Sequence, residues 1–288
     1  MNRSSEFITN KAFFGSYPTQ EYVDKLEHMG VTHFVDLTRV GEKRIVPYKT
    51  QYNYIHYPIE DRRVPSDWNS FARLIIYLVY IIKNLPTGNM IYVHCKGGHG
   101  RSGIVVACIL CYMYKISPSE AIAKTTRYHS RRKEMREKWR KMGSPQTRSQ
   151  KHFVSKFFEP LYIYKDYSKY FTAGFSNNSI ISVTLPKLGV TFPTAMEAFR
   201  ACESLSLDEI DGQFEDLISW KTKKEKIMYY ILKLKFDQHP TIKKNLLSSG
   251  LRPIIECSND SFWGTNEVRG RNKFGKMVGT LREELLMF

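Results

Sequence analysis

The chain has 288 residues, of which 42% are hydrophobic and 25% charged, and its formal net charge is +16. This length and composition are typical of a folded globular protein with about two domains. The longest apolar run, residues 74–82, is too short for a membrane-spanning helix, which needs ~20 residues. Residues 1–10 lack the apolar core of a signal peptide, so we expect a cytoplasmic protein, with the nucleus as the alternative.

Predicted strands and helices alternate along the first half of the chain. β-Branched and aromatic residues favour strands at 32–37, 54–59 and 89–94. Helices are expected at 20–29, 67–84 and 101–114, and from residue 117 onwards. The last of these begins with a predicted capping box, in which Ser117 precedes Pro118 and Glu120 follows. This alternation predicts an α/β domain whose central, mostly parallel sheet is flanked by helices.

The character of the sequence changes after a further predicted helix at 152–161. Residues 162–170 are polar and rich in tyrosine. Residues 1–165 contain 27 lysines and arginines against 13 acidic residues (net +14), whereas residues 166–288 contain 17 against 15 (net +2). We therefore predict two domains, 1–165 and 166–288, the second a smaller, mainly helical α+β domain. The first domain should attract anions, and its densest basic stretch, 127–141, is interpreted as a solvated helix face.

The chain has five cysteines, and this odd, sparse set fits a reducing compartment better than a disulfide framework. Cys108 and Cys111 form a CxxC pattern inside the apolar run 104–114. No second cysteine or histidine pair completes a zinc site, so both residues are interpreted as core residues. We expect neither a metal nor a cofactor.

The strongest chemical pattern is His-Cys-Lys-Gly-Gly-His-Gly-Arg-Ser-Gly at residues 94–103, between a predicted strand and a predicted helix. Glycines let the backbone curl so that several N–H groups, together with the helix N-terminus, converge on one anion. The planar guanidinium of Arg101 would close this nest by binding two phosphate oxygens. The residues expected to line it for substrate binding are Lys96, Gly97, Gly98, His99 and Gly100.

Cys95 lies at the bottom of this nest, where the N–H groups and Arg101 would stabilise a thiolate. The thiolate is placed for in-line attack on phosphorus, which gives a phosphocysteine intermediate that water hydrolyses. The Ser102 hydroxyl would donate a hydrogen bond to the departing thiolate. His94 is expected either to hold the loop through its ring N–H groups or to pack as a strand residue.

The leaving oxygen needs a proton, and Asp61 is the favoured donor. It follows the predicted strand 54–59 and enters a loop that ends at Pro65, where a carboxylic acid can reach a neighbouring site. Asp36, which lies within a strand, and Glu60 are the alternatives.

Over about residues 10–160 the sequence resembles the protein tyrosine phosphatase superfamily, and more closely its dual-specificity branch. The resemblance depends on the His94–Ser102 signature, on Tyr57-Pro58-Ile59-x-Asp61, and on the strand 31–37. It implies that Cys95 is the nucleophile, that Arg101 binds phosphate and that Asp61 is the general acid. Gln146 or Gln150 resembles the water-positioning glutamine of some branches.

The second half contains two carboxylates and two tryptophans in a pattern that suits a flat ring: Glu197, Trp220, Asp260 and Trp263. Tryptophans stack on bases, while paired carboxylates can stabilise an oxocarbenium-like ribose and activate water, as N-glycosidic cleavage requires. The alternative is that these aromatic residues build the core.

Residues 170–288 resemble the NADAR (YbiA-like) N-glycosidases, which act on riboflavin-pathway intermediates or on ADP-ribosylated guanine. The resemblance rests on the segments 189–197, 260–264 and 270–277. It implies active-site roles for the four residues above. Members often have Gln and Lys shortly after the Glu, whereas residues 198–204 here read Ala-Phe-Arg-Ala-Cys-Glu-Ser.

The expected function is hydrolysis of phosphotyrosine, phosphoserine or phosphothreonine in proteins. The alternatives are a phosphatase for phosphoinositides or RNA 5′-phosphates, and a second domain that binds phosphate or ADP-ribose without turnover. The expected partners are a phosphorylated protein for the first domain and a nucleic acid or ADP-ribosylated substrate for the second.

Overall fold

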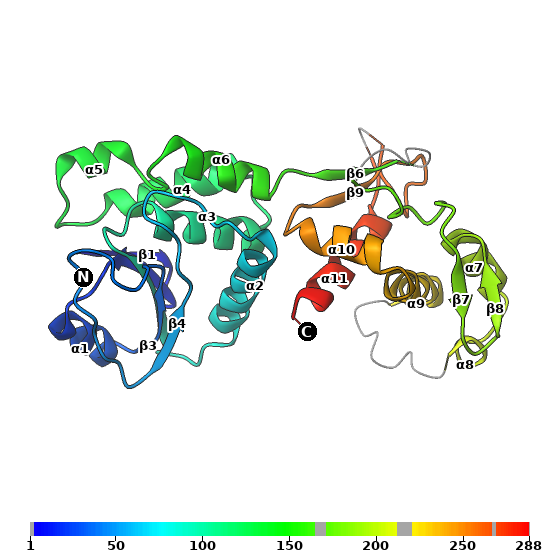
Figure 1. The fold of residues 1–288 in the computed structure, drawn as a ribbon, viewed down its shortest axis with the longest axis horizontal. Coiled ribbons are helices and arrows are strands. Elements are labelled where there is room, and N and C mark those ends of the chain that lie inside the picture. The colour runs from blue at the N-terminus through cyan, green and yellow to red at the C-terminus, as the bar shows by residue number, and fades with distance from the viewer. Residues whose placement is uncertain (1–2, 165–170, 212–220, 267–268, 288) are drawn as a thin grey trace. The chain divides into compact units, whose positions relative to one another are not determined.

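The computed structural model describes residues 3–164, 171–211, 221–266 and 269–287. It divides the chain into two compact units, Met1–Glu159 and Pro160–Phe288 (Figure 1). Within the described residues, no helix is long and apolar enough to cross a membrane.

The first unit is built on one five-stranded sheet with the order β1-β2-β5-β3-β4. Its strands are β1 (Ser4–Ile8), β2 (Ala12–Ser16), β3 (Val31–Asp36), β4 (Asn53–His56) and β5 (Met90–Cys95). All neighbours pair in parallel except β1, which is antiparallel to β2 at one edge. Every residue of the central strand β5 is buried, as expected for a parallel strand covered on both faces. The predicted, mostly parallel sheet is confirmed, and β1 and β2 are strands that the sequence patterns did not reveal.

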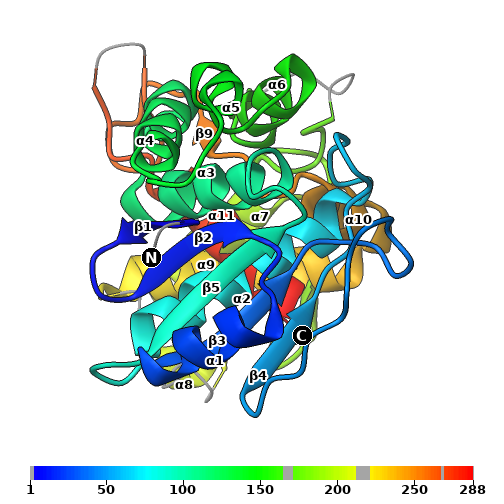
Figure 2. The same ribbon diagram turned by 90° about the vertical axis from the view of Figure 1, so that its left-hand side faces the viewer.

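Helices cover both faces of this sheet. They are α1 (Gln20–His28), α2 (Trp68–Asn84), α3 (Arg101–Tyr114), α4 (Pro118–Ser130), α5 (Glu137–Met142) and α6 (Arg148–Phe157). Figures 1 and 2 show α1 on one face and α2, α3, α4 and α6 on the other. The first eleven residues of α3 are all buried, which makes it the central helix of that layer.

Local sequence signals explain where several of these helices begin. The Asp67 carboxylate accepts hydrogen bonds from the backbone of Asn69 and Ser70 and so caps α2. Ser117 caps α4 by accepting from the N–H of Glu120, although only this half of the predicted capping box forms. The predicted helix at 152–161 is instead α6, which begins at Arg148 because Thr147 and Gln150 form a complete capping box there.

Residues 161–163, which the sequence patterns placed in the first domain, form β6 (Leu161–Ile163) of the second unit. This strand pairs in parallel with β9 (Ile254–Glu256), so the first unit ends before it. The other described elements are β7 (Val183–Leu185), β8 (Val190–Phe192), α7 (Ala195–Cys202), α8 (Leu207–Ile210), α9 (Lys223–Gln238), α10 (Pro240–Ser248) and α11 (Lys273–Met287). The expectation of a smaller, mainly helical α+β unit is therefore confirmed.

The described core of the second unit is mainly apolar, and Lys235 is buried in it. Lys235, on α9, donates hydrogen bonds to the carbonyl of Ser176 at 2.6 Å and to Oγ of Ser179 at 2.7 Å. Burial lowers the pKa of Lys235 to about 7 and raises that of the buried Glu256 to about 7, although their opposite charges counteract both shifts. Lys235 therefore fixes the turn that follows residue 175 to the core.

An aromatic cluster joins α2 to α6 in the first unit and gives a test of its core. The ring of Phe71 packs against those of Phe153 and Phe157 at 5.5 and 5.2 Å between centroids. We expect Phe71→Ala to lower the free energy of unfolding by ~3–5 kcal/mol, because it removes a buried ring and leaves a cavity. Tyr80, on the same helix, is 60% exposed, and we expect Tyr80→Ala to change stability by less than ~0.5 kcal/mol. Urea unfolding monitored by hydrogen exchange in peptides of the first unit would measure the free energy of unfolding of both variants. An equal loss of stability in the two would contradict the placement of Phe71 in the core.

Candidate active site

The phosphate-binding loop connects the end of β5 at Cys95 to the start of α3 at Arg101. Gly98 in this loop has a φ of +71°, a conformation that side chains rarely adopt. A Cβ atom there would also lie 2.3 Å from the backbone carbonyl carbon of Gly15 on β2. Glycine is therefore required at 98 for the loop to fold tightly against the sheet.

A buried arginine supports this loop from behind. The guanidinium of Arg132 donates hydrogen bonds to the carbonyls of Gly98 (2.7 Å) and Phe14 (3.1 Å) and to Oγ of Ser5 (3.0 Å). Arg132 is only 3% exposed, so the interpretation of residues 127–141 as a solvated face is wrong at this position. Its partners lie far away in the sequence, and no local pattern distinguishes it from the exposed arginines around it.

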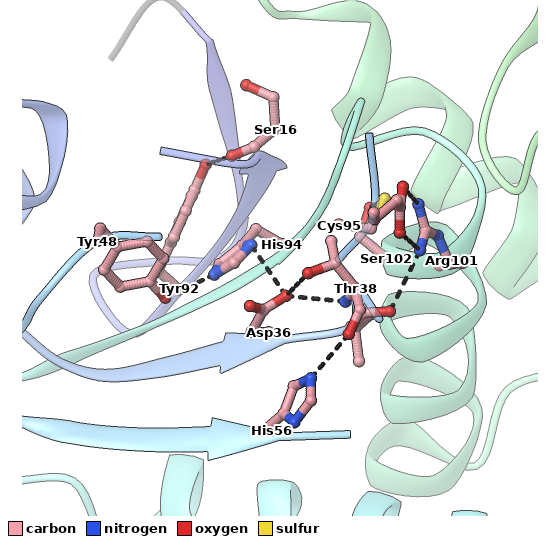
Figure 3. A network of polar contacts seen from close by, with 12 residues as sticks. Ser16, Asp36, Thr38, Tyr48, His56, Tyr92, His94, Cys95, Arg101 and Ser102 are labelled. Carbon is pink, nitrogen blue, oxygen red and sulfur yellow. Dashed lines mark hydrogen bonds and ion pairs between the residues drawn. The ribbon is translucent and has the colours of Figure 1, made fainter. Parts of the chain in front are cut away.

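The proposed nucleophile and its neighbouring hydroxyl lie together at the base of the loop. Cys95 and Ser102 are both buried, and Sγ of Cys95 is 3.6 Å from Oγ of Ser102 (Figure 3). Ser102 lies in the first turn of α3, so its hydroxyl can bond to a thiolate from the same side as the helix N-terminus.

The guanidinium of Arg101 is almost completely buried and is held by two carboxylates. Glu42, in the loop after β3, accepts hydrogen bonds from both terminal nitrogens at 2.7 and 2.8 Å. The carbonyl of Ile59 accepts another at 3.0 Å. The hydrogen bonds and the positive charge of Arg101 lower the pKa of the Glu42 carboxyl, although burial opposes them. Glu42 was not identified from the sequence, because it lies in an irregular polar loop 59 residues from its partner.

Asp61 reaches the same guanidinium from the loop that follows β4. Its Oδ1 accepts a hydrogen bond from Nη2 of Arg101 at 2.9 Å, while its side chain remains 54% exposed. The structure therefore brings Asp61, Arg101 and Cys95 to one place. Glu60, the alternative acid, is exposed and does not line the cavity that contains these residues.

Asp36, the other alternative, has a structural environment. It is 3% exposed and accepts hydrogen bonds from the backbone and hydroxyl of Thr38 and from the hydroxyl of Tyr54. His94 lies beside it, with Nδ1 3.8 Å from Oδ1 (Figure 3). The ring of His94 bonds to the hydroxyl of Tyr48 at 2.7 Å rather than to the phosphate-binding loop, and burial lowers the pKa of His94 to about 4.

The two glutamines resembling a water-positioning residue have different environments. Oε1 of Gln150 accepts from the backbone N–H groups of Gln146 and Thr147, and its amide nitrogen donates to the carbonyl of Arg63 at 3.2 Å. Gln150 is therefore engaged in fixing the start of α6 and the acid loop. Gln146 also lines the cavity, and its side chain makes no such bonds among the residues that the structure describes.

Together these segments enclose a cavity of about 30 Å³. It is lined by Asp61, Arg62, Cys95, Gly97, His99, Gly100, Arg101, Gln146 and Gln150. Larger hollows of about 350 and 490 Å³ lie elsewhere on the first unit, but neither contains a cysteine. The small cavity combines a buried thiol, a guanidinium and a carboxylic acid, which is a set suited to phosphoryl transfer.

The candidate residues of the second unit are only partly assembled. Asp260 is exposed, and its Oδ1 accepts from the backbone N–H groups of Phe262 and Trp263. The half-buried Trp263 packs edge-on against Phe199 of α7 at 5.7 Å. Glu197 is exposed on the same helix, where its backbone N–H bonds to the Thr194 cap. Trp220 lies outside the described residues.

Comparison with known families agrees with this geometry. The family model described as Swiss Army Knife protein, DSP-PTPase phosphatase domain, matches residues 4–154. The chain belongs to this phosphatase family. A second family model, described as NADAR domain, matches residues 213–286. That segment includes Trp220, Asp260 and Trp263 but begins after Glu197.

Two viral proteins and one bacterial protein are similar to this phosphatase. The candidate tyrosine phosphatase 197R of Invertebrate iridescent virus 6 is 36% identical over 266 residues, covering 92% of this chain and 89% of the relative. The candidate tyrosine phosphatase 067L of Invertebrate iridescent virus 3 is 41% identical over 160 residues, 55% of this chain and 66% of the relative. N-glycosidase YbiA of Escherichia coli is 33% identical over 69 residues, 23% of this chain and 43% of YbiA. The protein is thus a tyrosine or dual-specificity phosphatase with a YbiA-like NADAR domain.

The Glu42–Arg101 pair gives a test of the site. We expect Glu42→Gln to lower kcat/KM for para-nitrophenyl phosphate by ~10–100-fold, mainly by raising KM. The reason is that the guanidinium of Arg101 loses the charged partner that orients it for phosphate binding. The matched control is Glu21→Gln, which removes an exposed carboxylate that pairs with Lys25 on α1. Steady-state kinetics of both variants would measure the effect, and a Glu42→Gln enzyme with wild-type KM would contradict the orienting role.

Proposed function

We propose that the phosphatase domain hydrolyses phosphate monoesters through a phosphocysteine intermediate on Cys95. The observation that supports this most strongly is that Cys95, Arg101 and Asp61 line one small cavity, with the hydroxyl of Ser102 beside Sγ of Cys95. A thiolate there lies beneath the loop N–H groups and the start of α3, where an anion is stabilised.

The first step places the substrate phosphate in the loop, where Arg101 binds its oxygens. Glu42 occupies the outer edge of the guanidinium, which leaves the Nε side for phosphate. Asp61 shares Nη2 of Arg101, so an arriving phosphate competes with it for that nitrogen. Asp61, released in this way and protonated from solvent, can then donate its proton to the leaving oxygen while the Cys95 thiolate attacks phosphorus.

The second step hydrolyses the intermediate. Water attacks the phosphorus, Asp61 accepts the proton of the water, and the bond to sulfur breaks. Ser102 then donates a hydrogen bond to the departing thiolate across the observed 3.6 Å. Gln146 lines the cavity without being engaged as Gln150 is, which makes it the better candidate to orient the water.

The proposed substrate is a phosphorylated protein that carries phosphotyrosine, phosphoserine or phosphothreonine. Phosphoinositides and RNA 5′-phosphates are the alternatives, because Arg62 lines the cavity and Lys96 adds charge at the loop. A turnover screen across phosphopeptides, phosphoinositides and triphosphorylated RNA, with Cys95→Ser as the control, would rank these classes.

Substitution of the nucleophile and of the acid tests the mechanism. We expect Cys95→Ser to abolish turnover of para-nitrophenyl phosphate, because the serine hydroxyl is a poor nucleophile without a base. Asp61→Asn should lower kcat by ~10²–10⁴-fold, with the larger losses for phenyl phosphate, whose leaving group needs a proton more. Glu60→Gln is the matched control for Asp61 and should leave kcat unchanged. Cysteine-independent turnover would overturn the proposed mechanism, and a larger loss in Glu60→Gln than in Asp61→Asn would reassign the acid.

For the second domain we propose N-glycosidase activity, with Asp260 and Trp263 in the site. The supporting observation is that Asp260 holds the backbone of Trp263 while that ring packs on α7, which also carries Glu197. Trp263 would stack on a base or ring, and Asp260 and Glu197 would stabilise the oxocarbenium-like ribose and activate water. Domains 1–159 and 160–288 would then act on separate bonds.

Release of ADP-ribose from an ADP-ribosylated guanine oligonucleotide would test this activity. We expect Asp260→Asn and Glu197→Gln to reduce the rate by ~10²-fold or more, because each removes a carboxylate that the reaction uses. Asp208→Asn, an exposed carboxylate in α8, is the control. Equal rates in all of these proteins would remove both side chains from the mechanism.

A further inference from the structure

A pair of hydrogen-bonded histidines lies against the phosphate-binding loop. His99 is part of the loop and lines the cavity with Cys95 and Arg101. Its Nδ1 is 2.7 Å from Nε2 of His129, in the last turn of α4, and the two rings meet edge-on at 5.0 Å. The ring of Trp139, in α5, also stacks on that of His99, at 5.2 Å with an interplanar angle of 20°.

Both imidazoles are neutral at physiological pH. Burial lowers the pKa of His99 to about 4 and that of His129 to about 3, and the positive charge of Arg132 adds to both shifts. Arg140 also acts on His129; its guanidinium bonds to the carbonyls of Ser130 and Arg132 next to this helix end. No carboxylate is among the groups that shift either histidine. A neutral pair leaves one proton for the shared hydrogen bond, so one ring donates and the other accepts.

The environment of His129 decides which ring donates. His129 is fully buried, and its Nδ1 has no hydrogen-bond partner among the described residues. If His99 donated, His129 would carry its proton on this Nδ1, as a buried and unsatisfied N–H beside two cations. If His129 donates from Nε2, its Nδ1 is unprotonated and carries a lone pair. The positive charges of Arg132 and Arg140 favour this unprotonated nitrogen. The second arrangement is the more stable, and it leaves the proton of His99 on Nε2.

The Nε2 edge of the His99 ring lies against the backbone of the phosphate-binding loop. A Cβ atom at Gly97 would lie 2.8 Å from Cδ2 and 3.3 Å from Nε2 of His99, so the edge of the ring covers the backbone of Gly97. Both residues line the cavity. We propose that His129 fixes the tautomer and orientation of His99, so that Nε2–H of His99 is a neutral hydrogen-bond donor to the phosphoryl group of the substrate. This inference rests on the proposed phosphatase mechanism; His129 is a positioning residue and His99 a binding residue.

The tautomer can be measured directly in the full-length protein. We expect ¹⁵N chemical shifts of the imidazoles, assigned with the His99→Gln and His129→Gln proteins, to show His99 protonated at Nε2 and His129 at Nε2. In His129→Phe, which keeps a flat ring but cannot donate, His99 should become a mixture of both tautomers. A wild-type His99 protonated at Nδ1 would overturn the inference.

Phosphate binding tests the functional consequence. The probe is inorganic phosphate, measured by calorimetry in a Cys95→Ser background and as a competitive inhibitor of the active enzyme. We expect His129→Phe to weaken its binding and to raise KM by ~10-fold, the loss of about one neutral hydrogen bond, with a smaller effect on kcat. His129→Gln keeps an amide donor near the position of Nε2 and should recover most of the binding.

The exposed His28, at the end of α1, gives the control variant His28→Phe, which should bind phosphate as the wild type does. Circular dichroism would establish that His129→Phe is folded. Unchanged phosphate binding in folded His129→Phe, or no recovery in His129→Gln, would refute the positioning role while leaving the cysteine mechanism intact. Loss of cysteine-dependent turnover would refute that mechanism without affecting the tautomer or the calorimetry.

Discussion

The active site depends on a guanidinium that is removed from water. Arg101 begins α3 with its side chain 1% exposed, and such a buried cation is stable only when hydrogen bonds and opposite charge surround it. Glu42 supplies a bidentate partner from the loop after β3, and Asp61 and the carbonyl of Ile59 come from the loop after β4. The two loops at the carboxyl edge of the sheet are thus held by one side chain, which the proposed mechanism also uses to bind phosphate.

A second buried arginine has the complementary role for the backbone. Arg132 binds the carbonyls of Gly98 and Phe14, so it ties the phosphate-binding loop to β2. Arg132 does not line the cavity, so the Gly98 carbonyl is bound from outside it, which leaves the N–H groups of the loop to converge on an anion. Gly98 adopts a positive φ that other residue types rarely adopt, and its carbonyl is the one that Arg132 binds. The shape of the loop and its support by Arg132 therefore depend on the same residue.

In the second unit, a buried and an exposed charged side chain have different structural roles. In the second unit, Lys235 is buried and bonds to the turn at Ser176 and Ser179, and it helps to build the core rather than a described cavity. The exposed carboxylate of Asp260 instead organises the backbone under Trp263. In the second unit the buried lysine thus fixes the core, while the exposed carboxylate of Asp260 remains accessible to solvent.

The sequence by itself determined the parts of the protein whose residues are close along the chain. The phosphate-binding segment is continuous, from the strand through Cys95 and the glycines to Arg101 at the start of a helix. Asp67 immediately precedes α2, the helix that it caps. Local patterns were therefore sufficient to predict both features. Tertiary structure alone decided the supporting residues. Glu42 meets Arg101 across 59 residues, Arg132 meets Gly98 across 34, and His129 meets His99 across 30. A charged or imidazole side chain has the same local pattern whether it is solvated or buried, and only the packing of distant segments supplies the partners that make burial stable.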